Sequence, residues 1–172
     1  MSNLMSNPIY VSELVSEDFE IVRHVLVESY QQYESYFSPQ AWEDYSKRIF
    51  SSIDNPNVDK ILVAKLDHEI LGSLQLFRSG EKAYEIPELQ IQAPTIRLLG
   101  VHPRARGRGV GKALLNAAIH DAKSLGKSSV YLHTTDFMDH AIRIYEKHGF
   151  NRDESKDFSR GSIVSKCYRL DL

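Results

Sequence analysis

The sequence has few of the features that would place it outside the ordinary globular proteins. It contains a single cysteine, Cys167, so no disulfide can form within the chain, which fits a reducing compartment. No apolar run is long enough to cross a bilayer, and the N-terminus lacks the basic and then apolar pattern of a signal peptide. We therefore expect a cytoplasmic protein with no membrane partner.

The chain also lacks an excess of charge, internal repeats and linker-like changes of composition. Its 21 Lys and Arg residues stand against 23 Asp and Glu residues, for a formal net charge of −2. This balance implies no general affinity for nucleic acid. Because 172 residues are enough for a sizeable core, we expect one domain over residues 1–172 and no nucleic-acid partner.

What the chain does contain is a basic, glycine-rich turn between an apolar run and a helical segment. The run 96–101 predicts a buried strand, and apolar residues at helical spacing extend to Leu125, with Gly126 placed to end that helix. Cations crowd the N-terminal end of this helix, where positive charge is normally unfavourable. The turn also alternates glycines, which let a backbone approach a ligand closely. An anion-binding turn explains this coincidence better than a solvated basic turn.

The spacing in this turn excludes the commonest phosphate motifs. A P-loop needs Ser or Thr after its Lys, whereas Ala113 follows Lys112, and the glycines run G-x-G-x-G rather than G-x-G-x-x-G. An RNA-binding Arg-Gly tract would need surrounding low-complexity sequence, which is absent. The pattern that remains, Arg106-x-x-Gly109-x-Gly111, resembles the pyrophosphate-binding motif of the GNAT superfamily of N-acetyltransferases, which hold acetyl-coenzyme A.

A second stretch, 141–150, strengthens this resemblance. It looks like the second signature of the family, a short helix that ends in Tyr-x-x-x-Gly-Phe, here from Tyr145 to Phe150. The two motifs occur in order and are separated by a helix and a strand. The resemblance covers roughly residues 96–150, and the rest of the chain agrees with the family in element order only.

The patterning along the whole chain predicts an α+β fold with the order β-α-α-β-β-β-α-β-α-β-β. Residues 79–94 read as a long irregular loop. The resemblance implies a GNAT-like mixed, mostly antiparallel central sheet flanked by helices, in which strands 96–101 and 129–134 splay apart to admit the pantetheine arm. The predicted strands are 9–14, 60–66, 69–78, 96–101, 129–134, 151–158 and 163–170, and the predicted helices are 16–30, 38–55, the segment from the basic turn to 125, and 138–148.

The resemblance also implies roles for particular residues, with no metal. Tyr145 carries over as the general acid that protonates the departing thiolate, because a phenol stays protonated at neutral pH. The alternative for Tyr145 is a packing role on its helix. The cofactor-binding residues implied are Leu99, Gly100 and Val101 for the pantetheine arm, and Arg106, Gly107, Arg108, Gly109, Val110, Gly111, Lys112 and Ala113 for the diphosphate.

The general base and the acceptor site are less well marked. Thr95 stands where many family members have a Glu, so we assign Glu88 as the candidate base, with Glu85 as a neighbour and a solvated loop as the alternative. Together with Glu81, these acids would attract a cationic amine. We expect His102 and His133 to be structural, and Met138, where the family often has Asn, to leave one pantetheine contact unmade. Of the aromatic residues between the first two helices, we expect most to pack and one or two to line the acceptor site: Tyr30, Tyr33, Tyr36, Phe37, Trp42 and Tyr45.

The sequence thus predicts an acetyl-CoA-dependent N-acetyltransferase that transfers an acetyl group to a primary amine of a small molecule or peptide, by direct attack in a ternary complex. One alternative is a non-catalytic acyl-CoA sensor on the same fold, and another is an enzyme that modifies proteins. The sequence leaves open the acceptor amine, the base and the oligomeric state, a homodimer included.

Overall fold

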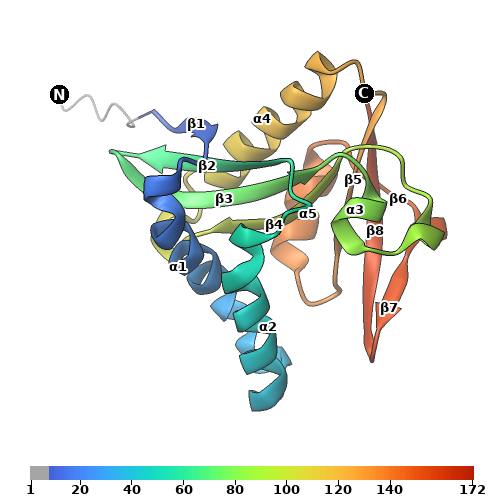
Figure 1. Cartoon of the computed structure of the whole chain (residues 1–172), viewed down its shortest axis with the longest axis horizontal. Helices are drawn as coiled ribbons and strands as arrows, with labels where there is room; N and C mark the ends of the chain where they lie inside the picture. Colours follow the sequence, from blue (N-terminus) through green and yellow to red (C-terminus); the bar gives the residue numbers. More distant parts are fainter. Residues whose placement is uncertain (1–7) are drawn as a thin grey trace.

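The computed structural model describes residues 8–172, so the first part of the N-terminus that we compared with a signal peptide lies outside the described residues. The strands and helices follow the predicted order, with two additions (Figure 1). The strands are β1 (Tyr10–Glu13), β2 (Lys60–Leu66), β3 (Glu69–Phe77), β4 (Thr95–Val101), β5 (Ser129–Thr134), β6 (Asn151–Arg152), β7 (Phe158–Arg160) and β8 (Ile163–Asp171). The α-helices are α1 (Phe19–Tyr30), α2 (Pro39–Ser51), α3 (Gly80–Tyr84), α4 (Val110–Ser124) and α5 (Asp139–Lys147).

All eight strands belong to one sheet in the order β1-β2-β3-β4-β5-β8-β6, with β7 paired to β8. Only the β4–β5 pair is parallel. The β2–β3 hairpin turns at Asp67 and His68, which both have positive φ, as a tight hairpin turn requires. The predicted mixed, mostly antiparallel GNAT-like α+β fold is confirmed.

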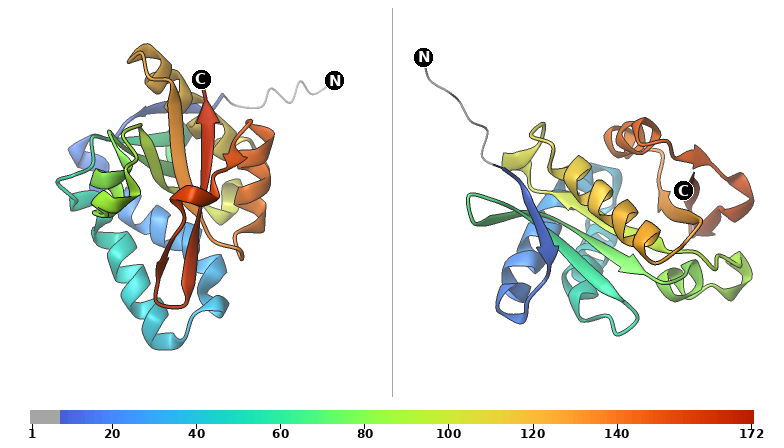
Figure 2. Two further views of the ribbon diagram at one scale, coloured as in Figure 1. Left: turned by 90° about the vertical axis from the view of Figure 1, so that its right-hand side faces the viewer. Right: turned by 90° about the horizontal axis from the view of Figure 1, so that it is seen from above.

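Helices cover both faces of this sheet (Figure 2). On one face α4 and α5 pack through a large apolar cluster that includes Leu114 and Ala118. On the other face α1 and α2 pack through a second cluster that includes Leu26 and Ile49. The two faces are therefore separate layers, and any passage between them has to run through the sheet itself.

Three local predictions were wrong. Residues 79–94 are not an irregular loop: Ser79 caps α3 by accepting a hydrogen bond from the Lys82 N–H at 3.1 Å, and Gly80 lies against Ile91. The predicted strand 151–158 is split into β6 and β7 by the 3-10 helix Glu154–Lys156, after which Asp157 accepts the Cys167 N–H at 2.7 Å. A 3-10 helix, Ser16–Asp18, precedes α1, so the helix does not begin at residue 16.

The splay of the two central strands is present. Strands β4 and β5 pair only at Thr95 with Tyr131 and at Ile96 with Leu132. Beyond these pairs β4 bulges at Leu98, whose φ is +52°, and its register with β3 shifts at the same point. The strands diverge from there toward their C-terminal ends, which opens a gap in the middle of the sheet.

Across residues 8–172 we find no helix with the length and apolar character needed to cross a membrane. The same residues contain no group of three or more His, Cys, Asp and Glu side chains arranged to hold a metal ion.

Candidate active site

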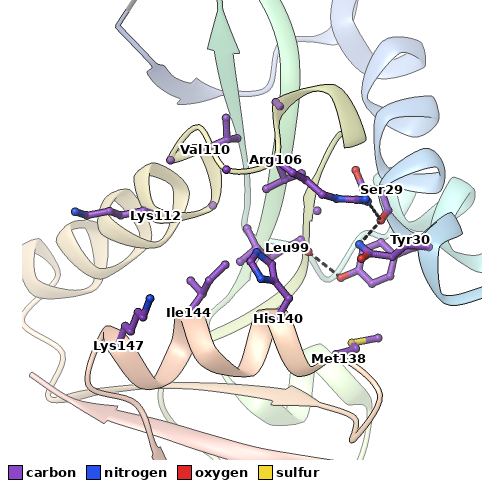
Figure 3. Close-up of a pocket in the computed structure, with 18 of the residues that line it drawn as sticks. Ser29, Tyr30, Leu99, Arg106, Val110, Lys112, Met138, His140, Ile144 and Lys147 are labelled. Atoms are coloured by element: carbon purple, nitrogen blue, oxygen red, sulfur yellow. Dashed lines mark hydrogen bonds between the residues drawn. The ribbon is translucent and has the colours of Figure 1, made fainter. Parts of the chain in front are cut away.

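A cavity of about 540 Å³, the first cavity, lies where β4 and β5 diverge. Its walls come from the end of α1, the end of β4, the turn before α4 with the first turns of that helix, and one side of α5 (Figure 3). Of the residues predicted to bind a cofactor, Arg108 and Ala113 do not line it. Those that do line it are Leu99, Gly100, Val101, Arg106, Gly107, Gly109, Val110, Gly111 and Lys112.

The turn that feeds α4 is shaped to receive an anion. Gly107 and Gly109 have φ of +76° and +84°, and a Cβ on either would have no atom closer than 4.0 Å, so backbone conformation rather than crowding calls for glycine there. The first hydrogen bond of α4 runs from the Ala113 N–H to the Gly109 carbonyl at 3.0 Å. The N–H groups of the residues just before Ala113 therefore have no partner in the helix and point toward its N-terminal end.

Gly100 and Gly111 meet two different steric needs. A Cβ on Gly111 would lie 3.6 Å from the Val101 side chain and 4.0 Å from that of Ile144, so glycine keeps the passage between β4 and α5 wide. A Cβ on Gly100 would lie 2.9 Å from the Ser29 Cβ. Gly100 is therefore required for the close packing of α1 on β4 as well as for the wall of the cavity.

Positive side chains surround the first cavity, and no carboxylate of the described residues lines it. Arg106, Lys112 and Lys147 are the cations in its wall. The Arg106 guanidinium donates to the Ser29 carbonyl at 3.1 Å, which fixes it at the end of α1 (Figure 3). Arg104 instead forms an ion pair with Glu69, so it does not contribute to this wall. The cavity thus suits an anionic ligand.

Comparison with known proteins agrees with this geometry. The family model described as the acetyltransferase (GNAT) family matches residues 19–150, well over half of the chain, and the chain therefore belongs to the GNAT acetyltransferase family. Among solved structures, PaiA N-acetyltransferase from Thermoplasma acidophilum, in complex with coenzyme A, has a TM-score of 0.69 at 21% identity and covers 95% of this chain and 99% of its own. A GNAT acetyltransferase from Staphylococcus aureus has a TM-score of 0.69 at 18% identity, over 96% and 99% of the two chains.

Curated relatives match over a shorter stretch. Mycothiol acetyltransferases from Gordonia bronchialis and Actinosynnema mirum are 37% and 39% identical to this chain over 57 residues. That stretch is 33% of this chain but only 18% and 19% of those two proteins. The match supports acyl transfer as the general chemistry of the family.

A second cavity, also of about 540 Å³, opens on the face of the sheet that carries α2 and α3. Tyr30 and Met138 line both cavities, so they stand at the border between them. The Tyr30 hydroxyl donates to the Leu99 carbonyl at 3.0 Å (Figure 3). Several residues in the walls of the second cavity are aromatic: Phe37, Tyr45, Tyr84, Phe137 and Phe158.

The predicted acid, Tyr145, lies in the core beside the first cavity. Its side chain is 7% exposed, packs edge-on against Phe150 with the ring centroids 6.1 Å apart, and lines neither cavity. Burial, with a smaller contribution from the phenols of Tyr33 and Tyr84, raises the pKa of Tyr145 above its ordinary value. The hydroxyl therefore remains protonated at neutral pH.

The structure does not bring Glu88 together with Tyr145. Glu88 is exposed on the 3-10 turn Pro87–Leu89 and lines neither cavity. Glu81 accepts a hydrogen bond from Gln92 on the surface, at 3.0 Å. Glu85 does line the second cavity, where its carboxylate accepts from Asn57 at 3.2 Å.

Sequence reasoning missed the polar groups of the second cavity. Within residues 8–172, four buried polar side-chain atoms have no hydrogen-bond partner, and all four residues line this cavity. His133 was expected to be structural, and its Nε2 does donate to the Lys156 carbonyl at 2.8 Å, while burial lowers its pKa. No motif marks these positions, because Gln75 on β3 and the others at the end of β5 are far apart in the sequence and come together only across β4. The four atoms are Gln75 Oε1, His133 Nδ1, Thr134 Oγ1 and Thr135 Oγ1.

Proposed function

We propose that this protein is an acetyl-CoA-dependent N-acetyltransferase that transfers an acetyl group to a primary amine by direct attack in a ternary complex. The observation that carries the proposal is the first cavity, in which unpaired helix N–H groups and three cations face a gap in the sheet. The diphosphate of acetyl-CoA would bind at Arg106–Lys112, and its pantetheine arm would run along Leu99–Val101. The coenzyme A complex of the similarly folded Thermoplasma enzyme supports this placement.

The two cavities would hold the two substrates on opposite faces of the sheet. The amine would attack the thioester carbonyl through the gap, so that a C–N bond forms and the C–S bond breaks. The nitrogen releases its proton to solvent, the departing thiolate takes one from Tyr145, and the Tyr145 phenolate regains a proton from solvent before the next turnover. Desolvation in this site would also raise the pKa of the coenzyme A thiol, so that its thiolate can take a proton from Tyr145 although the pKa of that phenol is raised too.

The second cavity favours this enzyme over a non-catalytic acyl-CoA sensor. A sensor needs only the cofactor site, whereas this cavity, on the far side of the gap, has buried polar atoms without partners. Such atoms are costly to leave unsatisfied and are normally paired by water or a ligand. They are suited to an acceptor substrate.

Calorimetry with coenzyme A tests the donor site. Gly109→Asp places a carboxylate in the basic turn and should abolish measurable binding. Gly126→Asp is a matched control, because Gly126 has a φ of +72° and lies at the other end of the same helix, so the added strain and charge are comparable. Affinity in the unchanged protein should fall with salt. Equal binding by both variants would contradict the assignment of the diphosphate to this turn.

A second assay tests the reaction. Release of coenzyme A from acetyl-CoA should accelerate on addition of an amine acceptor and should yield the acetylated amine by mass spectrometry. If the protein binds coenzyme A but none of the amines accelerates its release from acetyl-CoA, the protein is a sensor.

A further inference from the structure

The second cavity has the opposite charge from the one that the sequence led us to expect. Its charged lining residues are three arginines and one glutamate, namely Arg48, Arg97, Arg160 and Glu85. None of these arginines forms an ion pair with the described part of the chain. A cavity of this charge is a poor site for a simple cationic amine and a good site for a molecule with an anionic group.

Two of the arginines are held in place by the end of α3. Arg97 donates to the Ala83 carbonyl at 2.8 Å and lies over the Tyr84 ring, 4.9 Å from its centroid. Arg160 donates to the next carbonyl, that of Tyr84, at 2.7 Å. These contacts help to cap a short helix, which is a structural role. However, each uses one donor of a planar guanidinium and leaves its other N–H groups and its charge available.

The buried polar atoms provide an independent indication of a ligand. Gln75 is fully buried, and its amide nitrogen donates to Ser52 at 2.9 Å while its carbonyl oxygen has no partner. Thr134 is 4% exposed, and its hydroxyl also lacks a partner. Both residues line the second cavity. Polar groups of this kind are suited to a specific, largely desolvated substrate.

We propose that the acceptor is a small amine that also carries a carboxylate on an apolar or aromatic body, as a free apolar amino acid does. This inference rests on the function proposed above and names its substrate class. The carboxylate binds Arg97 and Arg160, and the body lies between the aromatic walls. The amine points into the gap, where the Gln75 oxygen accepts one of its hydrogens. Arg97 lines the second cavity and Leu99, two residues further along β4, lines the first, so the proposed carboxylate site lies next to the gap.

Matched sets of acceptors test this proposal. L-phenylalanine, L-phenylalaninamide and 2-phenylethylamine share a body and an amine but differ in charge, and a parallel set is built on L-leucine. We expect the carboxylate member of a set to stabilise the coenzyme A-bound protein against heat and to be acetylated with the highest kcat/KM. The phosphonate analogue of phenylalanine shows whether the anion must be a carboxylate.

Arginine variants locate the effect. Arg97→Gln removes the charge and shortens the side chain, and it should raise KM for the carboxylate acceptor about 10- to 100-fold, the usual range for a charged hydrogen bond. KM for the members that lack a carboxylate should change little. Arg160→Gln should act in the same direction, and because Arg160 is exposed it keeps the test open if Arg97→Gln fails to fold. Arg169→Gln, which lines neither cavity, is the control.

Two results would overturn the proposal. One is an amide or a decarboxylated amine that is turned over as well as its carboxylate partner. The other is a panel in which no carboxylate amine either stabilises the coenzyme A-bound protein or is acetylated. Binding of coenzyme A, measured in the same samples, separates these outcomes from a failure of the proposed function: loss of the anion preference leaves coenzyme A binding intact, whereas a wrong donor site does not.

Discussion

Replacement of Tyr145 by Phe separates a catalytic role from a packing role. The hydroxyl forms no hydrogen bond with residues 8–172, while the ring packs against Phe150 in the main core. Tyr145→Phe keeps the ring and deletes only the hydroxyl. We therefore expect the free energy of unfolding to change by less than about 1 kcal/mol, since no hydrogen bond is lost.

The kinetic effect should be much larger than the effect on stability. Loss of a general acid typically costs roughly a hundredfold or more in rate. Because the proton is delivered only in the transition state, kcat should fall while KM for acetyl-CoA stays near its original value. In the unchanged protein kcat should not decline on the alkaline side below about pH 10, since burial holds the pKa of Tyr145 above its ordinary value.

Tyr168→Phe is the matched control for this experiment. Tyr168 is also 7% exposed in the same core cluster, but it lines neither cavity. Steady-state kinetics and urea denaturation should be measured on both variants. If Tyr145→Phe and Tyr168→Phe have equal kcat, Tyr145 is a packing residue and the thiolate takes its proton from elsewhere. If Tyr145→Phe instead loses affinity for acetyl-CoA, the hydroxyl positions the cofactor.

Three further predictions concern stability and reactivity. Burial raises the pKa of Tyr45 to about 12 and also raises that of Tyr84, so both stay protonated in the fold and ionise first in the unfolded chain. The free energy of unfolding should keep this contribution in full below about pH 10 and lose it as the pH rises toward 12, by up to about 3 kcal/mol from Tyr45 alone. Urea denaturation near pH 8 and near pH 11 measures the loss. Burial raises the pKa of Cys167 to about 12, so a thiol reagent near pH 8 should label the protein only as fast as it unfolds; rapid native labelling would contradict this. Gly100→Ala would place a Cβ 2.9 Å from Ser29 and should cost about 1–3 kcal/mol in urea denaturation, whereas unchanged stability would show that α1 can move away from β4.

The first cavity could be predicted from the sequence because its signal is local. The basic turn, its glycines and the helix that follows are contiguous, so Arg106, Gly109 and Gly111 identify the site without any knowledge of the fold. Of the predicted cofactor-binding residues, Arg108 and Ala113 do not line the cavity, and Arg104, a cation of the same turn that was not among them, is held away from it by a distant partner. Arg104 pairs with Glu69, more than thirty residues earlier in the chain, and that pairing has no local signal.

The second cavity could not be predicted because its residues are scattered along the chain. Arg48 comes from α2, Arg97 from β4 and Arg160 from β7, and nothing in the sequence indicates that they share a site. The acids of residues 79–94 were visible together, so they suggested an acidic site. Once α3 forms, Glu81 faces Gln92 and Glu88 stays on the surface, while the arginines set the charge of the cavity.

The short pairing of β4 with β5 has a mechanical consequence. Within the sheet, only two residue pairs connect strands β1 to β4 with strands β5 to β8, so the sheet consists of two half-sheets that meet at Thr95 and Ile96. Under the proposed function, the pantetheine arm forms hydrogen bonds with the edge of β4 and takes the place of a missing strand between the two half-sheets. Amide hydrogens near Leu99 and Val101 should then exchange with solvent more slowly when coenzyme A is bound. Bound acetyl-CoA would then act as a structural link between the two half-sheets during each turnover, and the release of coenzyme A would remove that link.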